Sequence, residues 1–302
     1  MKVLLAGANS YIGARLIPTL LEKDHEVICL VRDKDHFFKT NPLAGMVTVI
    51  SGDLLRRQSI ERFPAGIDAA YYLVNAFTQT SGFSALGVLS AQNFMEALER
   101  ISCRQIITLS DIQSHTTASA DARLRVENIL SDGKSALTVL NTTMIVGEGS
   151  TAMEMFYALT AKVPIVLAQN WAKTRMQPIA TSDVLGYLES VLMNKLAYNL
   201  KFDIGGPEIL AFKQMLLTYI AIYKDFKPSV VTLPFLTSQI SSSLLNTLTP
   251  VSYPEAQILV ENLKSDTICR NNSIKEIIPR QCLTFKRALR LVHDIAEKSI
   301  SI

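Results

Sequence analysis

A short loop near the amino terminus carries the first residues that could bind a ligand. Gly7 and Gly13 bracket it within the stretch MKVLLAGANSYIGARLIPTLLE. Backbone N–H groups of such a turn, at the positive end of a helix, can bind a diphosphate. Ser10 takes the middle position of the glycine pattern, where its hydroxyl could itself bond phosphate. A strand-turn-helix without a ligand is the alternative. The loop predicts cofactor contacts at Gly7, Asn9, Ser10, Tyr11, Ile12 and Gly13.

Two further positions could bind the adenosine end of a dinucleotide. Arg32 ends an apolar run over 25–33, about 20 residues past the loop, where an acid would select a free ribose hydroxyl and an arginine suits a 2′-phosphate. Asp33 beside it weakens this argument, and a solvated strand-end arginine is the alternative. Asp53 and Leu54 follow the third strand, where the aspartate could receive the adenine amino group. The sequence therefore predicts NADP(H) in preference to NAD(H).

The elements that must position these residues alternate along the first half of the chain. Helical or turn-rich segments separate short apolar runs that are typical of buried strands. Such alternation predicts an α/β fold with a doubly wound, mostly parallel sheet of the Rossmann type. The predicted strands are 3–6, 25–33, 47–54, 69–74, 105–110 and 135–147.

Beyond Gly147 the strict alternation stops. Thr181 or Ser182 could cap a helix there, with Asp183 in its first turn. The predicted elements are helices over 151–164 and 181–194 and strands over 164–169, 199–206 and 229–235. We expect an NAD(P)-binding core over 1–147, to which 176–206 returns, and a smaller, mainly helical substrate lobe made of 148–175 and 207–302.

Composition narrows the functional class. The chain has 302 residues, 48% of them apolar, and a net charge of +3 without a Lys/Arg-rich block, so we expect no nucleic-acid partner. No apolar run reaches the roughly 18 residues of a membrane span, and we expect a cytoplasmic protein with no membrane partner. The four cysteines and four histidines are scattered, which predicts buried free thiols and no metal site.

Several motifs together resemble a known family. The sequence is similar to the atypical and extended short-chain dehydrogenase/reductases, and more closely to their NmrA-like and nucleoside-diphosphate-sugar epimerase branch. The resemblance implies a Rossmann core that binds NAD(P), with Leu73 and Val74 among the cofactor contacts, and a lobe that closes a substrate cleft. The motifs are GANSYIG at 7–13, VRD at 31–33, GDL at 52–54, LS at 109–110, IVGEGS at 145–150 and RMQPIATSDV at 175–184, with Trp171 before the last.

The catalytic motif of that family is incomplete. Family members carry a Ser or Thr at the end of the fifth strand, and then a Tyr-x-x-x-Lys pair that shuttles a proton. Ser110 matches the first position, but the usual spacing puts Ser119 at the tyrosine place and Arg123 at the lysine place. A serine hydroxyl is a far poorer acid than a phenol and arginine stays charged, so this pair cannot perform the same proton transfer. Arg123 remains a predicted cofactor contact, as does Ser110.

Other side chains could replace the missing pair. Asp111 follows Ser110 directly, and His115 lies on the same loop, although a merely solvated histidine is the alternative. Histidine is the side-chain type whose ordinary pKa lies closest to neutral pH. The predicted catalytic residues are therefore Ser110, Asp111 and His115. Asn141 stands where relatives often carry an arginine, which argues against a nucleotide-sugar diphosphate clamp. The predicted substrate-cleft residues are Tyr157, Trp171 and Gln177, with a core position as the alternative for Tyr157.

Two functions remain open at this point. The first is an NADP(H)-dependent oxidoreductase or epimerase-like enzyme that acts on a small, partly apolar substrate without the usual tyrosine. The second is a non-catalytic NADP(H)-binding redox sensor, or a regulatory or assembly partner of another protein, as the resemblance to NmrA-like proteins allows. The retained Ser110 favours the first, and the missing Tyr-x-x-x-Lys pair favours the second. A monomer and a homodimer are both compatible with the sequence.

Overall fold

A seven-stranded parallel sheet forms the centre of the protein. The computed structural model describes residues 1–60, 63–74, 81–112, 118–160, 165–168, 170–223, 229–232 and 265–300. The strand order is β11-β6-β5-β4-β1-β2-β3, and every neighbouring pair is parallel. The strands are β1 (Lys2–Ala6), β2 (Glu26–Val31), β3 (Thr48–Ser51), β4 (Ala69–Tyr72), β5 (Gln105–Asp111), β6 (Ala136–Thr142) and β11 (Leu200–Ile204). The predicted doubly wound fold is confirmed, and its order reverses between β1 and β4, where ligands of such sheets bind.

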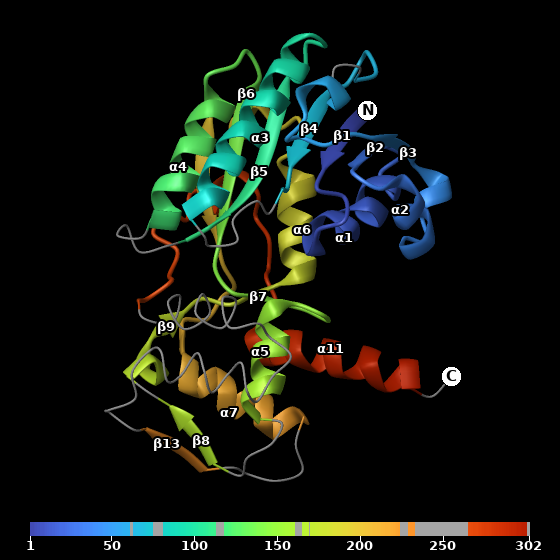
Figure 1. Cartoon of the computed structure of the whole chain (residues 1–302). Helices are drawn as coiled ribbons and strands as arrows, with labels where there is room; N and C mark the ends of the chain where they lie inside the picture. The colour runs from blue at the N-terminus through green and yellow to red at the C-terminus, as the bar shows by residue number, and fades with distance from the viewer. Residues whose placement is uncertain are drawn as a thin grey trace.

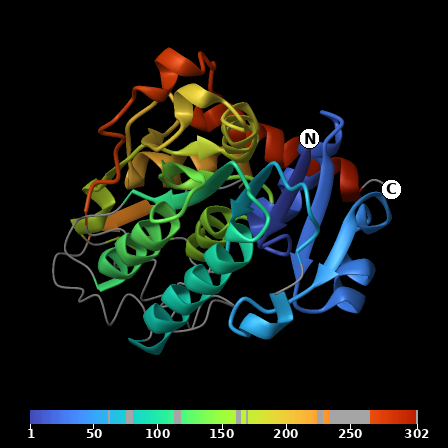
Figure 2. The same cartoon turned by 90° about the horizontal axis from the view of Figure 1, so that it is seen from above.

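Helices cover both faces of this sheet. One face carries α1 (Tyr11–Leu21), α2 (Lys34–Thr40) and α6 (Thr181–Ser190), and the other carries α3 (Ser81–Glu99) and α4 (Ala118–Ser131) (Figure 1). Figure 2 shows α3 and α4 side by side along their face. Successive strand residues alternate between the two cores, since Val3 and Leu5 pack towards α1 while Leu4 and Ala6 pack towards α3. This two-sided burial explains why the strands read as continuous apolar runs.

A second group of elements lies below the sheet in Figure 1 and has its own core. Phe156 stacks on Phe212 and Tyr219, with ring centroids 5.7 and 5.4 Å apart, and meets Phe285 edge to face at 6.0 Å. The helices are α5 (Thr151–Thr160), α7 (Phe212–Tyr223) and α11 (Phe285–Ile300). Paired short strands accompany them: β7 (Ile145–Val146) with β10 (Ile179–Ala180), β8 (Ile165–Ala168) with β13 (Ser229–Thr232), and β9 (Arg175–Met176) with β12 (Leu210–Ala211).

Short helical segments complete the described chain. They are η1 (Ala44–Met46), η2 (Arg57–Ile60), η3 (Asn170–Lys173), η4 (Lys195–Ala197) and α10 (Ile274–Ile277). Across the residues that the structure places, no helix has both the length and the apolar character that a membrane span needs. The division into a core and a substrate lobe, with the boundaries given above, stays a prediction.

Three local predictions were wrong. The segment 135–147 is not one strand, because β6 ends at Thr142 and β7 turns away to pair with β10. The cap of α6 is Ala180, which makes no side-chain hydrogen bond to the helix. Thr181 instead donates its hydroxyl to the Val146 carbonyl at 3.3 Å, so long-range contacts replaced the expected local cap. The helix also ends at Ser190, four residues before its predicted end.

Candidate functional site

The loop between β1 and α1 has room only for glycine at two positions. Gly7 has a φ of +94°, and a Cβ there would lie 2.3 Å from the Leu73 carbonyl oxygen at the end of β4. A Cβ on Gly13 would lie 2.1 Å from the Gly7 carbonyl oxygen. Both distances are far inside van der Waals contact, so any larger residue would push the loop away from the sheet. The two glycines hold backbone groups closely together at the switch point of the fold.

The first turn of α1 presents hydrogen-bond donors at this loop. Ser10 caps the helix, since its Oγ accepts the Gly13 N–H at 3.1 Å and its N–H donates to the Gly7 carbonyl at 2.9 Å. The serine hydroxyl keeps its own hydrogen for a further acceptor. Within the described part of the chain, the N–H groups of Tyr11 and Ile12 have no hydrogen-bond acceptor. Free donors at a helix start fit a diphosphate, as a dinucleotide cofactor carries.

The carboxyl ends of β2 and β3 carry the residues predicted for the adenosine end. Val31 and Ser51 are paired in these neighbouring strands, and exposed Arg32 follows directly. Asp33 caps α2, because its Oδ1 accepts the His36 N–H at 2.8 Å. The carboxylate that weakened the argument for NADP(H) is therefore engaged by its own helix.

The turn after β3 contains Asp53 and Leu54, the other two residues predicted for the adenosine end. Asp53 Oδ1 accepts the Leu55 N–H at 3.0 Å, and Arg56 lies 3.8 Å from the other carboxylate oxygen. Leu54 is buried, and its carbonyl accepts the Asn93 amide at 2.7 Å. The aspartate thus organises its turn while it stays partly accessible.

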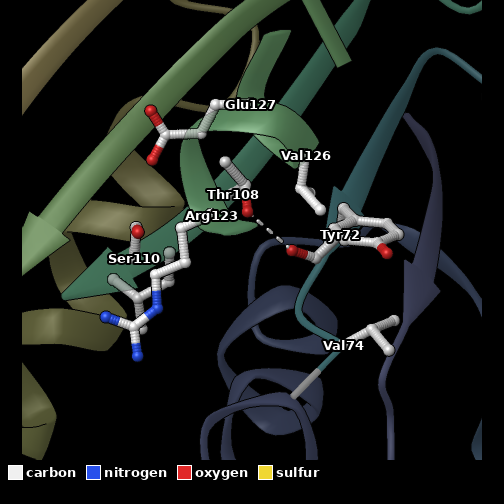
Figure 3. Close-up of a pocket in the computed structure, with 8 residues that line it drawn as sticks. Tyr72, Val74, Thr108, Ser110, Arg123, Val126 and Glu127 are labelled. Atoms are coloured by element: carbon white, nitrogen blue, oxygen red, sulfur yellow. Dashed lines mark hydrogen bonds between the residues drawn. The ribbon is translucent and has the colours of Figure 1, made fainter. Parts of the chain in front are cut away.

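A pocket opens where β4 and β5 end (Figure 3). Its floor is stabilised by Thr108, whose hydroxyl donates to the Tyr72 carbonyl at 2.9 Å. Leu73 lies beside it and donates its N–H to the Ala6 carbonyl at 2.9 Å, which joins this region to β1. The pocket is lined by Tyr72, Val74, Thr108, Leu109, Ser110, Arg123, Val126 and Glu127. The structure therefore brings three of the predicted cofactor contacts, Val74, Ser110 and Arg123, together in the lining of one pocket, with Leu73 directly before Val74.

Two ion pairs border this pocket. Arg123 Nη2 lies 2.8 Å from Asp111 Oδ2. Asp111, a predicted catalytic residue, is therefore paired with the arginine that stands where the family motif has its lysine. Glu127 pairs with Lys201 of β11 at 2.6 Å. The guanidinium side chain is 16% exposed and the Asp111 side chain 54% exposed, so the cation is the better buried partner of the first pair.

The pocket lacks an accessible phenol among the residues that line it. Tyr72 is the tyrosine there, and its hydroxyl donates to Ser90 Oγ at 3.0 Å inside the protein. Burial raises the pKa of Tyr72 to about 12, with the Ser90 hydrogen bond opposing part of that rise. Tyr72 is therefore unsuited to proton transfer near neutral pH. His115 lies outside the described residues, and so does the side chain of Ser119.

The residues predicted for a substrate cleft have different surroundings. Gln177 is buried and its amide joins three chain segments, since Nε2 donates to the Gly206 carbonyl at 2.8 Å and Oε1 accepts the Cys269 N–H at 3.1 Å. Tyr157 is 57% exposed on α5. Trp171 lies in η3, and its side chain is outside the described part. Their role towards a substrate stays a prediction.

The motif around Gln177 also holds the carboxyl-terminal segment. Buried Asp183 accepts the Leu283 N–H at 2.8 Å and pairs with Arg280 Nε at 3.1 Å. Asn141 stands where relatives often carry an arginine. Its side-chain amide donates to Asp203 Oδ1 at 3.0 Å and so connects β6 with β11. These polar residues of the family-like motifs have clear structural roles.

One contact of the cofactor loop was missed by sequence reasoning. The Tyr11 hydroxyl shares a hydrogen bond of 2.9 Å with Thr181 Oγ1 on α6. Arg15 lies over the Tyr11 ring at 4.0 Å and donates to the Glu148 carbonyl at 2.7 Å. Because these partners lie more than 130 residues apart, no local pattern could have indicated them. Among the described residues, no group of three His, Cys, Asp or Glu side chains gathers as metal ligands would.

A parallel sheet with a glycine loop at its switch point is typical of dinucleotide-binding Rossmann proteins. Residues 7–144 match the NAD(P)H-binding family. A curated 3-beta-hydroxysteroid dehydrogenase of Mycolicibacterium neoaurum is 32% identical over 71 residues, which span 24% of this chain and 18% of that protein. These 71 residues are thus a small part of the relative.

Solved structures extend the likeness to nearly the whole chain. A nucleoside-diphosphate-sugar epimerase from Staphylococcus aureus superposes with a TM-score of 0.74 and 14% identity, over 96% of this chain and 99% of that one. A Citrobacter sp. triphenylmethane reductase in complex with NADP(H) superposes with a TM-score of 0.75 and 15% identity. This superposition covers 97% of this chain and 100% of the reductase. These solved structures share the Rossmann fold of nearly the whole chain, and together with the NAD(P)H-binding match of residues 7–144 they agree with the resemblance seen in its motifs.

Proposed function

We propose that this protein binds NADP(H) in preference to NAD(H) and uses it to reduce a small, partly apolar substrate. The observation that carries the proposal is the closely packed glycine loop, in which the N–H groups of Tyr11 and Ile12 have no acceptor in the described part of the chain and are available to a diphosphate. Exposed Arg32 supports the 2′-phosphate preference, because Asp33 beside it is engaged as a helix cap. The NADP(H) complex of the superposed triphenylmethane reductase is consistent with this choice.

When bound, reduced nicotinamide supplies a hydride. The residues of this chain would hold the acceptor beside Ser110, whose hydroxyl can donate a hydrogen bond to an acceptor oxygen. The pocket offers no phenol of suitable pKa among its lining residues, since the Tyr72 hydroxyl is buried against Ser90. In this proposal the second hydrogen of a reduced carbonyl or quinone comes from water. Substrates whose reduced form is a stable anion, such as quinones, suit this site better than simple ketones.

The cofactor preference is tested by titrating the purified protein with NADPH and with NADH. A charge-assisted hydrogen bond to phosphate is worth roughly 1.5–3 kcal/mol, which corresponds to about 10-fold to 150-fold in affinity. We expect Arg32→Ala to lose that factor for NADPH and to leave NADH binding unchanged. Arg57→Ala is the matched control, because Arg57 is an exposed arginine paired with Glu96 at 2.7 Å. Equal affinities for both cofactors, unchanged in Arg32→Ala, would refute the preference.

A second candidate function is a redox sensor or regulatory partner that binds NADP(H) without turnover. The missing Tyr-x-x-x-Lys pair favours it, because the lysine place holds Arg123 in an ion pair with Asp111. Oxidation of NADPH against a panel of quinones, aldehydes and enones separates the two. Tight binding with no turnover across the panel would favour the sensor.

The cellular setting completes the proposal. We place the protein in the cytoplasm, where NADP(H) is available, with a small molecule as its principal ligand. A net charge of +3 without a basic block gives no support to a nucleic-acid partner. Size-exclusion chromatography with light scattering would distinguish a monomer from a homodimer.

A further inference from the structure

The ion pair at the edge of the pocket joins two unequal partners. Arg123 is fixed on α4 with its side chain 16% exposed, whereas the Asp111 side chain at the end of β5 is 54% exposed. An ion pair whose anion is half in solvent contributes little to the stability of the fold. The guanidinium keeps its charge at any working pH. Asp111 is therefore a counter-ion that another anion could replace at little cost.

The neighbouring acid, Glu127, has a cation of its own. Figure 3 shows its carboxylate above the Arg123 guanidinium, which lies on the side of Ser110. Lys201 binds Glu127 at 2.6 Å and balances its charge. The remaining pocket wall is apolar, since it includes Val74 and Val126. The site thus combines one fixed cation, one hydroxyl and an apolar surface.

We propose that Arg123 binds the oxyanion of an aromatic ligand in this pocket, with Asp111 displaced towards solvent. A planar guanidinium can donate two N–H groups to one oxyanion, Ser110 can add a third donor, and Val74 and Val126 can contact the ring. The ligand class is a phenolate, of which the hydroquinone monoanion is the form relevant to a reductase. The role of this site in quinone reduction rests on the proposed function, whereas its ability to bind an anion does not.

The reduction of a quinone balances with these groups. Reduced nicotinamide, when bound, would supply a hydride, which is a hydrogen with two electrons, to the quinone and would itself be left oxidised. The quinone becomes a hydroquinone monoanion, and its oxyanion accepts hydrogen bonds from Arg123 and Ser110. No proton leaves the arginine, and water supplies the second proton after the ligand is released. Electrostatic stabilisation of the oxyanion by fixed donors would replace the acid that the family motif lacks here.

Binding of 4-nitrophenolate to the NADP⁺-loaded protein tests this site, measured by equilibrium dialysis above the pH at which the probe ionises. We expect Arg123→Gln to weaken binding by about tenfold or more, and Arg123→Lys to weaken it less, because an ammonium keeps the charge without the planar fork. Asp111→Asn should strengthen binding several-fold, since it removes the competing anion. Arg125→Gln, an exposed neighbour on the same helix, should leave the affinity unchanged. A purely structural role of Arg123 would not make Asp111→Asn a tighter binder.

The outcomes separate this inference from the proposed function. Probe binding that is the same in wild type, Arg123→Gln and Asp111→Asn would overturn the anion site even if quinones are reduced. Arg123-dependent probe binding without quinone turnover would uphold the site and contradict the reductase. Thermal melting of each variant shows whether it is folded. If Arg123→Gln unfolds, Asp111→Asn and Arg123→Lys decide the question, and weaker or equal binding by Asp111→Asn overturns the proposal.

Discussion

Replacing Gly13 by alanine tests whether the glycine loop is as tightly packed as its geometry indicates. In an ordinary helix this change stabilises by up to about 1 kcal/mol, because alanine has the higher helix propensity. Here the new methyl group would lie 2.1 Å from the Gly7 carbonyl oxygen and 2.9 Å from Ser10 Oγ. The carbonyl cannot yield freely, since it accepts the Ser10 N–H at 2.9 Å. The loop would have to move.

The magnitude follows from three opposing contributions. Overpacking of a dense site costs about 1–3 kcal/mol. Loss of the Ser10 cap, which accepts the Gly13 N–H at 3.1 Å, costs about 1 kcal/mol. The helix propensity returns about 1 kcal/mol. We therefore expect Gly13→Ala to lower the free energy of unfolding by about 1–3 kcal/mol, or the melting temperature by roughly 2–4 °C per kcal/mol.

Urea unfolding followed by circular dichroism measures this change, and NADPH titration measures the loss of binding when the loop moves. Gly45→Ala is the control, because nothing lies within 4 Å of the Cβ that it would add. We expect Gly45→Ala to be as stable as the wild type or slightly more stable, with the same affinity for NADPH. A Gly13→Ala protein that equals the wild type in both measurements would refute the steric argument for the loop.

Two further predictions concern charged residues outside the loop. Asp183→Asn removes the buried charge that faces Arg280, and we expect a loss of about 1–3 kcal/mol in urea unfolding with unchanged NADPH affinity; equal stability would contradict the anchoring role. The Lys2 N–H and then the Arg104 side chain lower the pKa of Asp68, while burial opposes them. A lowered folded-state pKa means that Asp68 stabilises the fold above its unfolded value of about 3.9 and loses this effect as the pH falls through the folded value. Asp68→Asn should therefore make the free energy of unfolding depend less on pH below about pH 4, and an unchanged pH dependence would contradict this.

The fold core could be predicted from the sequence because its signals are local. The spacing of Gly7 and Gly13 around a helix start and the apolar runs of the strands depend on neighbouring residues alone, and the structure confirmed the mostly parallel, doubly wound sheet that they predict. The strand over 135–147 was wrong for a physical reason. Met144 accepts the Ile179 N–H at 3.0 Å, a contact that competes with continued pairing along β5.

The candidate site was only partly predictable for the same reason. Ser110 and Arg123 follow from motif spacing, but the ion pair of Arg123 with Asp111 depends on how α4 packs against the end of β5. The contacts of Gln177 and Asp183 reach across roughly 30–100 residues of chain. Their motif could be noticed in the sequence, but its function as an anchor for the carboxyl-terminal segment required the fold.

A crystal structure of the protein with excess NADPH would show whether the glycine loop binds the cofactor. We expect a diphosphate on the N–H groups of Tyr11 and Ile12, with Ser10 Oγ within hydrogen-bond distance and the 2′-phosphate on the Arg32 guanidinium. A loop whose donors are covered by the protein's own side chains, with NADPH absent or bound elsewhere, would contradict it.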